Sequence, residues 1–438
     1  MDVQLGFIAI GVMLLLLTLR MPIGLALMAV SLVGLYIMRG PNVMMGSARI
    51  VPFEFIAHWT LSAIPMFILM GAVASNAGMV GLLFKALKLW FGKLPGGLAI
   101  ATSFAGAGFA AVSGSSIATT AAMGRIAVPE MLRAGYQPAL ATGVASAVGT
   151  IGALIPPSLI MIFYATFAQV SAGKMLMAGL IPGVMTALGY AVLVYIRCRI
   201  NPALAPIPEG IESVTLAEKI AGLGPVWPIP VLAVGMIGAI YAGIATVTEA
   251  AAAGAVMTIL LVTLQGRLSF AMLMLSLKQT VSTTSSVLLI AIGASLMTQF
   301  LAYTGMPFYL SGMVTAFTSD PLTLMFMACI LYLVLGCFLD PLGVMLLTLP
   351  ILLPVIHSAG IDQIWAGVIF VKMLEIGLLT PPIGLNVFVM KSVMGNRVSL
   401  GVIFKGTAWF LAAEVVIMAI LLYFPIVSTW LPSVMIGG

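Results

Sequence analysis

Two proline pairs and one isolated aspartate interrupt otherwise apolar segments of this 438-residue sequence. Pro156-Pro157 and Pro381-Pro382 each break such a segment, and Asp340 lies in the middle of another. Proline lacks an N–H group and breaks helices, so it leaves upstream carbonyl groups without donors. An ionised carboxylate at mid-membrane is expensive and usually functional. We expect these breaks to bind ligands, although simple proline kinks and a capping role for Asp340 are the structural alternatives.

The composition places these residues in a membrane. Hydrophobic residues make up 62% of the chain and charged residues 7%, whereas soluble domains carry about 25% charged residues. Apolar runs of about 20 residues are long enough to cross a bilayer as helices. The sequence thus predicts an all-α polytopic membrane protein with spans near residues 4–20, 22–38, 58–78, 138–165, 175–197, 228–244, 249–265, 283–303, 364–390 and 408–432.

Two further apolar stretches are too long for one span and carry a polar break at the centre. The first, at 94–133, is interrupted by Ser113-Gly114-Ser115-Ser116. The second, at 321–356, is interrupted around Asp340. Each stretch is predicted to form two half-length helices that make a re-entrant hairpin. Broken backbone at membrane depth persists only where protein, water or a ligand satisfies it.

An internal repeat relates the two hairpins and the two proline breaks. Ile151–Pro157 resembles Ile376–Pro382, at an offset of 225 residues, and the same offset aligns Ser115 with Asp340. The predicted organisation is therefore a pair of repeats, each with a hairpin and a Pro-Pro-broken helix. Its segments are scaffold helices at 1–57, a first repeat at 58–200 with hairpin 94–133 and broken helix 138–165, a linker at 201–227, and a second repeat at 228–438 with hairpin 321–356 and broken helix 364–390.

The basic residues predict opposite orientations for the repeats. One arrangement places 13 of the 18 Lys and Arg residues on one face, which should be cytoplasmic, and only Arg39, Arg49 and Lys174 on the other. The first hairpin then enters from the cytoplasm and the second from outside. Inverted repeats with broken helices are typical of secondary transporters. A channel or passive pore, a proton-coupled transporter and an intramembrane enzyme remain as alternatives; no GxSxG, HExxH or Walker motif supports an enzyme.

Freed carbonyls and hydroxyls suit an alkali cation, and half-helix N-termini suit an anion. One sodium site is predicted in each repeat, between the hairpin tip and the break. A small organic anion is expected nearby, with the second break contributing Asn386. The candidate sodium ligands are Ser113, Ser115, Ser116, Gly152, Ile155 and Pro156 in the first repeat, and Asp340, Gly343, Gly377, Thr380 and Pro382 in the second. The candidate substrate contacts are Ser113, Ser158, Asp340, Asn386 and Arg125.

Other charged residues within apolar segments have plainer interpretations. Lys372 and Glu375 are three residues apart on one predicted helix and are expected to pair. Arg125 is expected to snorkel to the interface, with substrate contact as the alternative. Glu414 is interpreted as a packing or capping residue. The three cysteines form no metal-binding pattern.

Several motifs resemble one transporter family over nearly the whole chain. Pro65–Gly71, Ser113–Ser116, Gly152–Ser158, Thr248–Ala251 and Gly377–Pro382 are similar to the large membrane subunit of tripartite ATP-independent periplasmic (TRAP) transporters, of the ion transporter superfamily. The resemblance implies a sodium-coupled, elevator-type importer of carboxylates, such as C4-dicarboxylates or sialic and sugar acids, in the bacterial inner membrane. It also implies two partners, a separate small four-helix membrane subunit and a periplasmic substrate-binding protein.

The charge asymmetry gives a testable topology. We expect single cysteines introduced into loops 198–226, 266–279 and 391–406 to resist an impermeant thiol reagent in intact cells and to react after permeabilisation, because these loops carry the cytoplasmic charge. Both termini should be periplasmic. Labelling of these loops from outside intact cells would refute the orientation.

Overall fold

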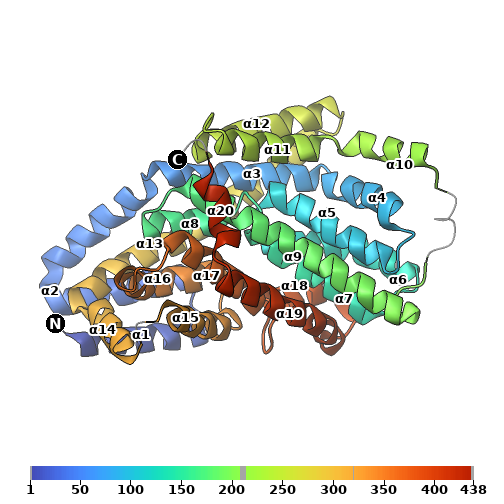
Figure 1. Ribbon diagram of the computed structural model, residues 1–438. Coiled ribbons are helices and arrows are strands. Elements are labelled where there is room, and N and C mark those ends of the chain that lie inside the picture. The colour runs from blue at the N-terminus through green and yellow to red at the C-terminus, as the bar shows by residue number, and fades with distance from the viewer. Residues whose placement is uncertain (1, 208–213, 319, 436–438) are drawn as a thin grey trace.

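The computed structural model describes residues 2–207, 214–318 and 320–435, and every regular element in these ranges is helical (Figure 1). Seven of the described helices are long and apolar enough to span a membrane, or eight if one bent pair counts as a single span. The predicted class, an all-helical multi-span membrane protein, is confirmed. Part of the predicted linker, residues 208–213, lies outside the described ranges.

The first half of the chain contains the first hairpin, α5 and α6, and the first broken helix, α7, η2 and α8. The bounds are α1 Val3–Thr18, α2 Ile23–Ile56, η1 Trp59–Ser62, α3 Ala63–Asn76, α4 Met79–Phe91, α5 Gly97–Ser113, α6 Ser116–Arg133, α7 Pro138–Ala147, η2 Val148–Ala153, α8 Leu159–Ala168, α9 Ala172–Ile200, η3 Pro202–Leu204, α10 Leu216–Leu223 and η5 Gly224–Val226.

The second half contains the second hairpin, α15 and α16, and the second broken helix, α17 and α18. The bounds are α11 Pro228–Tyr241, α12 Val247–Leu264, α13 Phe270–Thr304, α14 Met306–Phe317, α15 Pro321–Gly336, α16 Pro341–Ser358, α17 Gln363–Gly377, α18 Leu385–Met394, η6 Gly395–Arg397, α19 Leu400–Tyr423 and α20 Ile426–Ser433.

The two halves of the chain share the same local backbone features. The Pro156-Pro157 and Pro381-Pro382 bonds are both cis. Gly78 and Gly305 both adopt left-handed backbone, with φ of 75° and 73°, and each precedes the first residue of a short helix, α4 or α14. These two helices, together with α10, were absent from the predicted spans. The span predicted at 22–38 corresponds to the first part of α2, because the helix is interrupted at Gly40, whose φ and ψ are non-helical. The second part of α2, which continues to Ile56, was absent from the predicted spans.

Four helices form a layer that flanks the broken elements, and we call α2, α3, α12 and α13 the scaffold layer. In this layer α13 packs along α2, and α12 packs along α3. Both hairpin tips touch the layer at glycines. A Cβ atom at Gly71 of α3 would lie 2.9 Å from Ser113 Cα, and one at Gly343 would lie 2.9 Å from the Ile23 side chain of α2.

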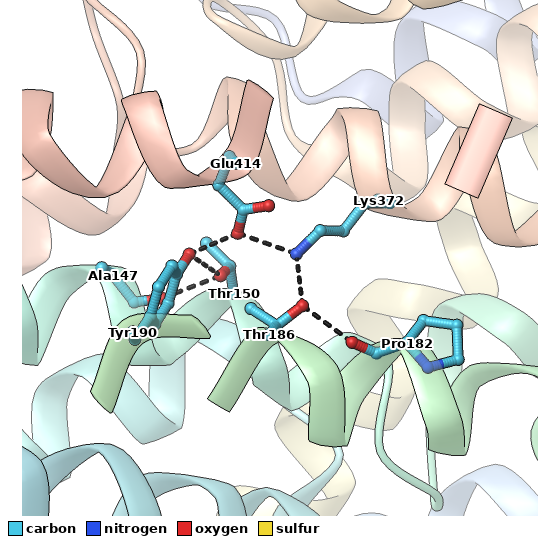
Figure 2. Close-up of polar contacts among 7 residues, drawn as sticks. All are labelled: Ala147, Thr150, Pro182, Thr186, Tyr190, Lys372 and Glu414. Atoms are coloured by element: carbon cyan, nitrogen blue, oxygen red, sulfur yellow. Dashed lines mark hydrogen bonds and ion pairs between the residues drawn. The ribbon is translucent and has the colours of Figure 1, made fainter. Parts of the chain in front are cut away.

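A buried ion pair joins the second broken helix to α19 and α9. Lys372 Nζ on α17 lies 2.7 Å from Glu414 Oε1 on α19, and both side chains are fully buried. Lys372 also donates a 2.8 Å hydrogen bond to Thr186 Oγ1 on α9. Figure 2 shows the three side chains facing one another across the helix contact. The predicted Lys372–Glu375 pair was therefore wrong, and Glu414 is an ion-pair partner rather than a cap.

The same network reaches the first broken helix. Tyr190 of α9 donates a hydrogen bond to Glu414 Oε1, and its hydroxyl lies 3.1 Å from Thr150 Oγ1 in η2 (Figure 2). Thr150 in turn donates to the carbonyl of Ala147 at 2.8 Å. One buried charge pair thus ties elements from both halves of the chain together. Removing one member of such a pair leaves an uncompensated buried charge.

Lys372→Met should therefore destabilise the protein severely, by about 3–5 kcal/mol. Lys88→Met is the matched control, because Lys88 forms a half-exposed ion pair with Glu130 at 2.9 Å, of a type that contributes about 0–1 kcal/mol. Thermal unfolding of the purified variants in detergent measures the difference. Equal melting temperatures for the two variants would contradict the structural role of the buried pair.

Candidate functional site

The first hairpin turns at Gly114, where its tip meets the first break. Gly114 has a φ of 60°, in the left-handed region that favours glycine. A Cβ atom at this position would lie 2.1 Å from the carbonyl oxygen of Pro157, and one at Gly152 would lie 2.9 Å from the carbonyl of Ser115. The tip and the break therefore pack backbone against backbone, with no room for side chains between them.

This contact encloses backbone carbonyls that have no donors. Gly152, Ile155 and Pro156 are buried, and within the described part of the chain their carbonyl oxygens accept no hydrogen bond. Buried backbone groups without partners are rare in proteins. In addition, α5 ends at Ser113 and η2 ends at Ala153, so two helix C-termini with partial negative charge converge here. Helices α6 and α8 begin at the same contact, at Ser116 and Leu159, so helix N-termini also lie beside these carbonyl oxygens. Carbonyl oxygens are ligands that a small hard cation takes.

The second tip and break repeat this arrangement with different chemistry. A Cβ atom at Gly377 would lie 2.6 Å from the carbonyl carbon of Gly336, so the C-terminal ends of α17 and α15 are in contact. The carbonyls of Thr380 and Pro382 accept no hydrogen bond from the described residues. The Thr380 hydroxyl donates to the Ile376 carbonyl at 2.8 Å. This break is more open than the first, because Pro382 is exposed whereas Pro156 is buried.

Asp340 is the N-cap of α16 at the second tip. Its Oδ2 atom accepts a 3.2 Å hydrogen bond from the Gly343 N–H, the capping role that the sequence left open. The Leu342 backbone N–H also interacts with this carboxylate. The side chain also lies within electrostatic reach of Glu375 on α17. A capping carboxylate can still accept a ligand, because its two oxygens together offer about four acceptor sites.

At the first tip, Ser115 and Ser116 take different roles. Ser115 caps α6 by accepting a 3.3 Å hydrogen bond from Ala118 N, and its carbonyl accepts one from the Thr119 hydroxyl at 2.9 Å. Ser116 is buried, and its hydroxyl faces the Glu375 carboxylate of α17 without a well-formed hydrogen bond. Ser113 lies 3.3 Å from Thr119 through their hydroxyl groups. Of the serines at this tip, Ser116 thus has the hydroxyl without a well-formed hydrogen bond.

A cavity of about 310 Å³ lies between the first hairpin tip and the scaffold layer. Arg125 lines it, is exposed, and makes no ion pair or hydrogen bond with any described residue. None of the described residues that line the cavity carries a carboxylate, so its net charge is positive. The polar lining side chains are Ser75 and Asn76 from α3, Gln279 and Thr283 from α13, and Ser113, Ser115 and Arg125 from the hairpin.

Two of the five predicted substrate contacts, Ser113 and Arg125, line this cavity and the other three do not. Ser158 is buried, where its hydroxyl donates a 2.5 Å hydrogen bond to Ala153 and caps α8. Asn386 is fully buried beside Gly149, and Asp340 lies at the opposite hairpin tip. The five predicted substrate contacts therefore do not form one site. Ser113 and Arg125 line the open cavity, whereas Ser158, Asn386 and Asp340 lie in the packed regions of the tips and breaks.

Two amide residues of the scaffold layer were missed by the sequence analysis. Asn76 donates hydrogen bonds to Ser276 Oγ at 2.9 Å and to Gln279 Oε1 at 3.0 Å, which links α3 to α13 beside the cavity. Isolated amides in apolar helices were the signal that could have revealed them. Their partners lie about 200 residues away, a separation at which sequence patterns give no register.

Comparisons with known proteins agree with this architecture. The C4-dicarboxylate TRAP transporter large permease protein DctM of Pseudomonas aeruginosa is 37% identical over 393 residues, covering 88% of this chain and 89% of that protein. The sialic acid TRAP transporter large permease protein SiaM of Vibrio cholerae is 28% identical, covering 95% and 96%. The crystal structure of the Alcanivorax borkumensis YdaH transporter matches with a TM-score of 0.65 at 13% identity, covering 87% and 88%.

A family model gives the assignment directly. The model described as "Tripartite ATP-independent periplasmic transporter, DctM component" matches residues 10–427 of this chain. The match includes both hairpins and both breaks. The protein is thus a transporter subunit rather than an enzyme, and it belongs to the DctM family of large permease components of TRAP transporters.

Proposed function

We propose that this chain is the membrane transport subunit of a sodium-coupled secondary importer of small organic anions. The observation that carries the proposal is the convergence of helix C-termini at both tip–break contacts, with unpaired carbonyls beside them. Neutral oxygens outnumber carboxylates at these contacts, which favours sodium over a proton as the coupling ion. Carbonyl and hydroxyl oxygens are the ligands that hard cations take in proteins.

Each repeat would hold one sodium ion. The first site would use oxygens of Ser113, Ser115, Ser116, Gly152, Ile155 and Pro156. The second would use Asp340, Gly343, Gly377, Thr380 and Pro382, with a carboxylate where the first site has serine hydroxyls. The sites are therefore related in position but unequal in charge, and the second should hold sodium more tightly.

The substrate would occupy the cavity beside the first tip. Its positive lining and its size of about 310 Å³ suit a small carboxylate, since ligand pockets begin at about 300 Å³. The printed substrates of two relatives, a C4-dicarboxylate and sialic acid, are both organic acids. Arg125 would pair with the carboxylate, while Ser113 would contact both the substrate and the first sodium ion. Such a shared residue couples the two binding events.

The mechanism would be an elevator motion of two inverted repeats. The hairpins and broken helices would move against the scaffold layer, carrying the substrate between α3, α13 and the first tip. The domain division at 1–57, 58–200, 201–227 and 228–438 is part of this proposal. The subunit would work in the bacterial inner membrane with a separate small four-helix subunit and a periplasmic binding protein that delivers the substrate.

A channel or a proton-coupled transporter would use the same broken helices differently. A channel would pass substrate downhill only, without accumulation against a gradient. A proton-coupled carrier would work without sodium. Both alternatives are tested by uptake into proteoliposomes that contain the complete complex.

Arg125→Gln should weaken substrate binding about 10–100-fold, because a charge-assisted hydrogen bond contributes about 1.5–3 kcal/mol. The measurement is the KM for radiolabelled succinate, or for sialic acid if succinate is not transported, with the reconstituted complex. Arg133→Gln is the control, since Arg133 ends the same helix and pairs with Glu130 at 2.8 Å. An unchanged KM in Arg125→Gln would remove Arg125 from the substrate site.

Sodium coupling predicts that replacing sodium by choline at fixed pH and voltage reduces uptake at least tenfold. Ser113→Ala and Asp340→Ala should lower uptake similarly while the protein stays folded, because each removes ligands from one sodium site. Asp320→Asn is the control for Asp340, as Asp320 caps the other arm of the same hairpin through a 2.8 Å hydrogen bond to Thr323. Undiminished uptake in choline would show that sodium is not the coupling ion.

A further inference from the structure

Glu375 is a carboxylate that neither proposed sodium site uses. It lies on α17, two residues before Gly377, and it is fully buried. Neither of its oxygen atoms makes a hydrogen bond with any described residue. An ionised carboxylate buried with only the Ser116 hydroxyl facing it is strongly unfavourable, so the group either carries a proton or has a cation bound beside it.

Lys372 does not supply that charge. The lysine lies one turn away on α17, but its ammonium is committed to Glu414 and Thr186 at 2.7 and 2.8 Å. The remaining charged neighbour of Glu375 is Asp340 at the second hairpin tip. One lysine therefore faces three carboxyl groups in this buried region, and any ionisation beyond that of Glu414 leaves a surplus of negative charge.

Other buried polar atoms without well-formed hydrogen bonds lie near the Glu375 carboxylate. The Glu375 carboxylate interacts with Ser116 at the first tip, whose hydroxyl is otherwise unpartnered. Both amide atoms of Asn386, a fully buried residue of the second break, also lack partners. The Asn386 Nδ2 atom and the Ser116 carbonyl oxygen lie 2.9 and 2.8 Å from one point, the Cβ position of Gly149. Side chains from both repeats thus meet at an unsatisfied polar junction.

We propose that Glu375, Ser116 and Asn386 bind a further monovalent cation, sodium, at the junction of the two repeats. The inference rests on the proposed sodium coupling but adds a site and a charged ligand to it. Carboxylate, hydroxyl and amide oxygens form a hard-cation ligand set, and the bound ion neutralises the surplus charge. Because Ser116 also belongs to the first sodium site and Glu375 is close to Asp340, this cation links the occupancy of the two repeats.

The competing explanation is structural. Ser116 is the first residue of α6, and the positive end of that helix would favour the Glu375 carboxylate without any ion. The two explanations differ for Glu375→Gln, which is isosteric but neutral. If a cation binds, the neutral variant is more stable than wild type without sodium. If Glu375 only caps α6, the variant is less stable in every salt.

The experiment measures melting temperature by tryptophan fluorescence for the purified full-length protein. Sodium chloride is titrated against choline chloride at constant ionic strength and pH. Glu375→Gln should melt at a higher temperature than wild type in choline, and its midpoint for stabilisation by sodium should rise at least tenfold. Glu375→Asp keeps the negative charge, but its side chain is one methylene group shorter, so the carboxylate lies farther from the proposed site. This variant should melt like wild type in choline and should also bind sodium more weakly. Glu130→Gln, a neutral change at the far end of α6, should match wild type.

The outcomes separate this site from the proposed function. If wild type responds to sodium and Glu375→Gln responds with the same midpoint, the junction site is wrong and sodium coupling stands. The same conclusion follows if Glu375→Gln lowers the melting temperature equally in both salts. If wild type gains no stability from sodium, both the coupling and the junction site are overturned.

Discussion

Carbonyl groups left without donors, where the backbone breaks inside the membrane, constrain the rest of this structure. Each break is held against a hairpin tip by glycines, Gly114 and Gly152 in one repeat and Gly336 with Gly377 in the other. The contact excludes side chains and brings helix C-termini together. In hydrocarbon such groups would cost several kcal/mol each. A bound cation would offset that cost, and under the proposed function its binding would be part of the transport cycle.

Charge placement follows from the same constraint. Lys372 and Glu414 form a buried ion pair that holds α17, α19 and α9 together, whereas Asp340 and Glu375 lie near the tips without a basic partner of their own. Arg125 is kept apart from all of them, in the cavity beside the scaffold layer. The protein thereby separates a structural ion pair, the proposed cation ligands and the arginine that we propose as the partner of an anionic substrate. Neutralising one group should leave the other two intact.

The sequence predicted the features that depend on local chemistry. Proline pairs, the Ser113–Ser116 break and Asp340 marked the tips and breaks, because helix interruption is determined by a few adjacent residues. Features that depend on packing between distant segments were missed or wrong: Lys372 pairs with Glu414 on another helix, not with Glu375, and Asn76 reaches Gln279 on α13. The short helix α4 was also missed, since its start at the left-handed Gly78 resembles a loop.

Sodium binding at the tip–break contacts is the proposal on which the transport mechanism depends. The most direct measurement is a pair of cryo-EM maps of the complete complex, one in sodium chloride and one in choline chloride, at a resolution that shows ordered ions. The account predicts a density peak in sodium, absent in choline, surrounded by the oxygens of Ser113, Gly152 and Pro156, and a second peak beside Asp340 and Gly377. Maps that are identical in the two salts, with no peak at either contact, would contradict it.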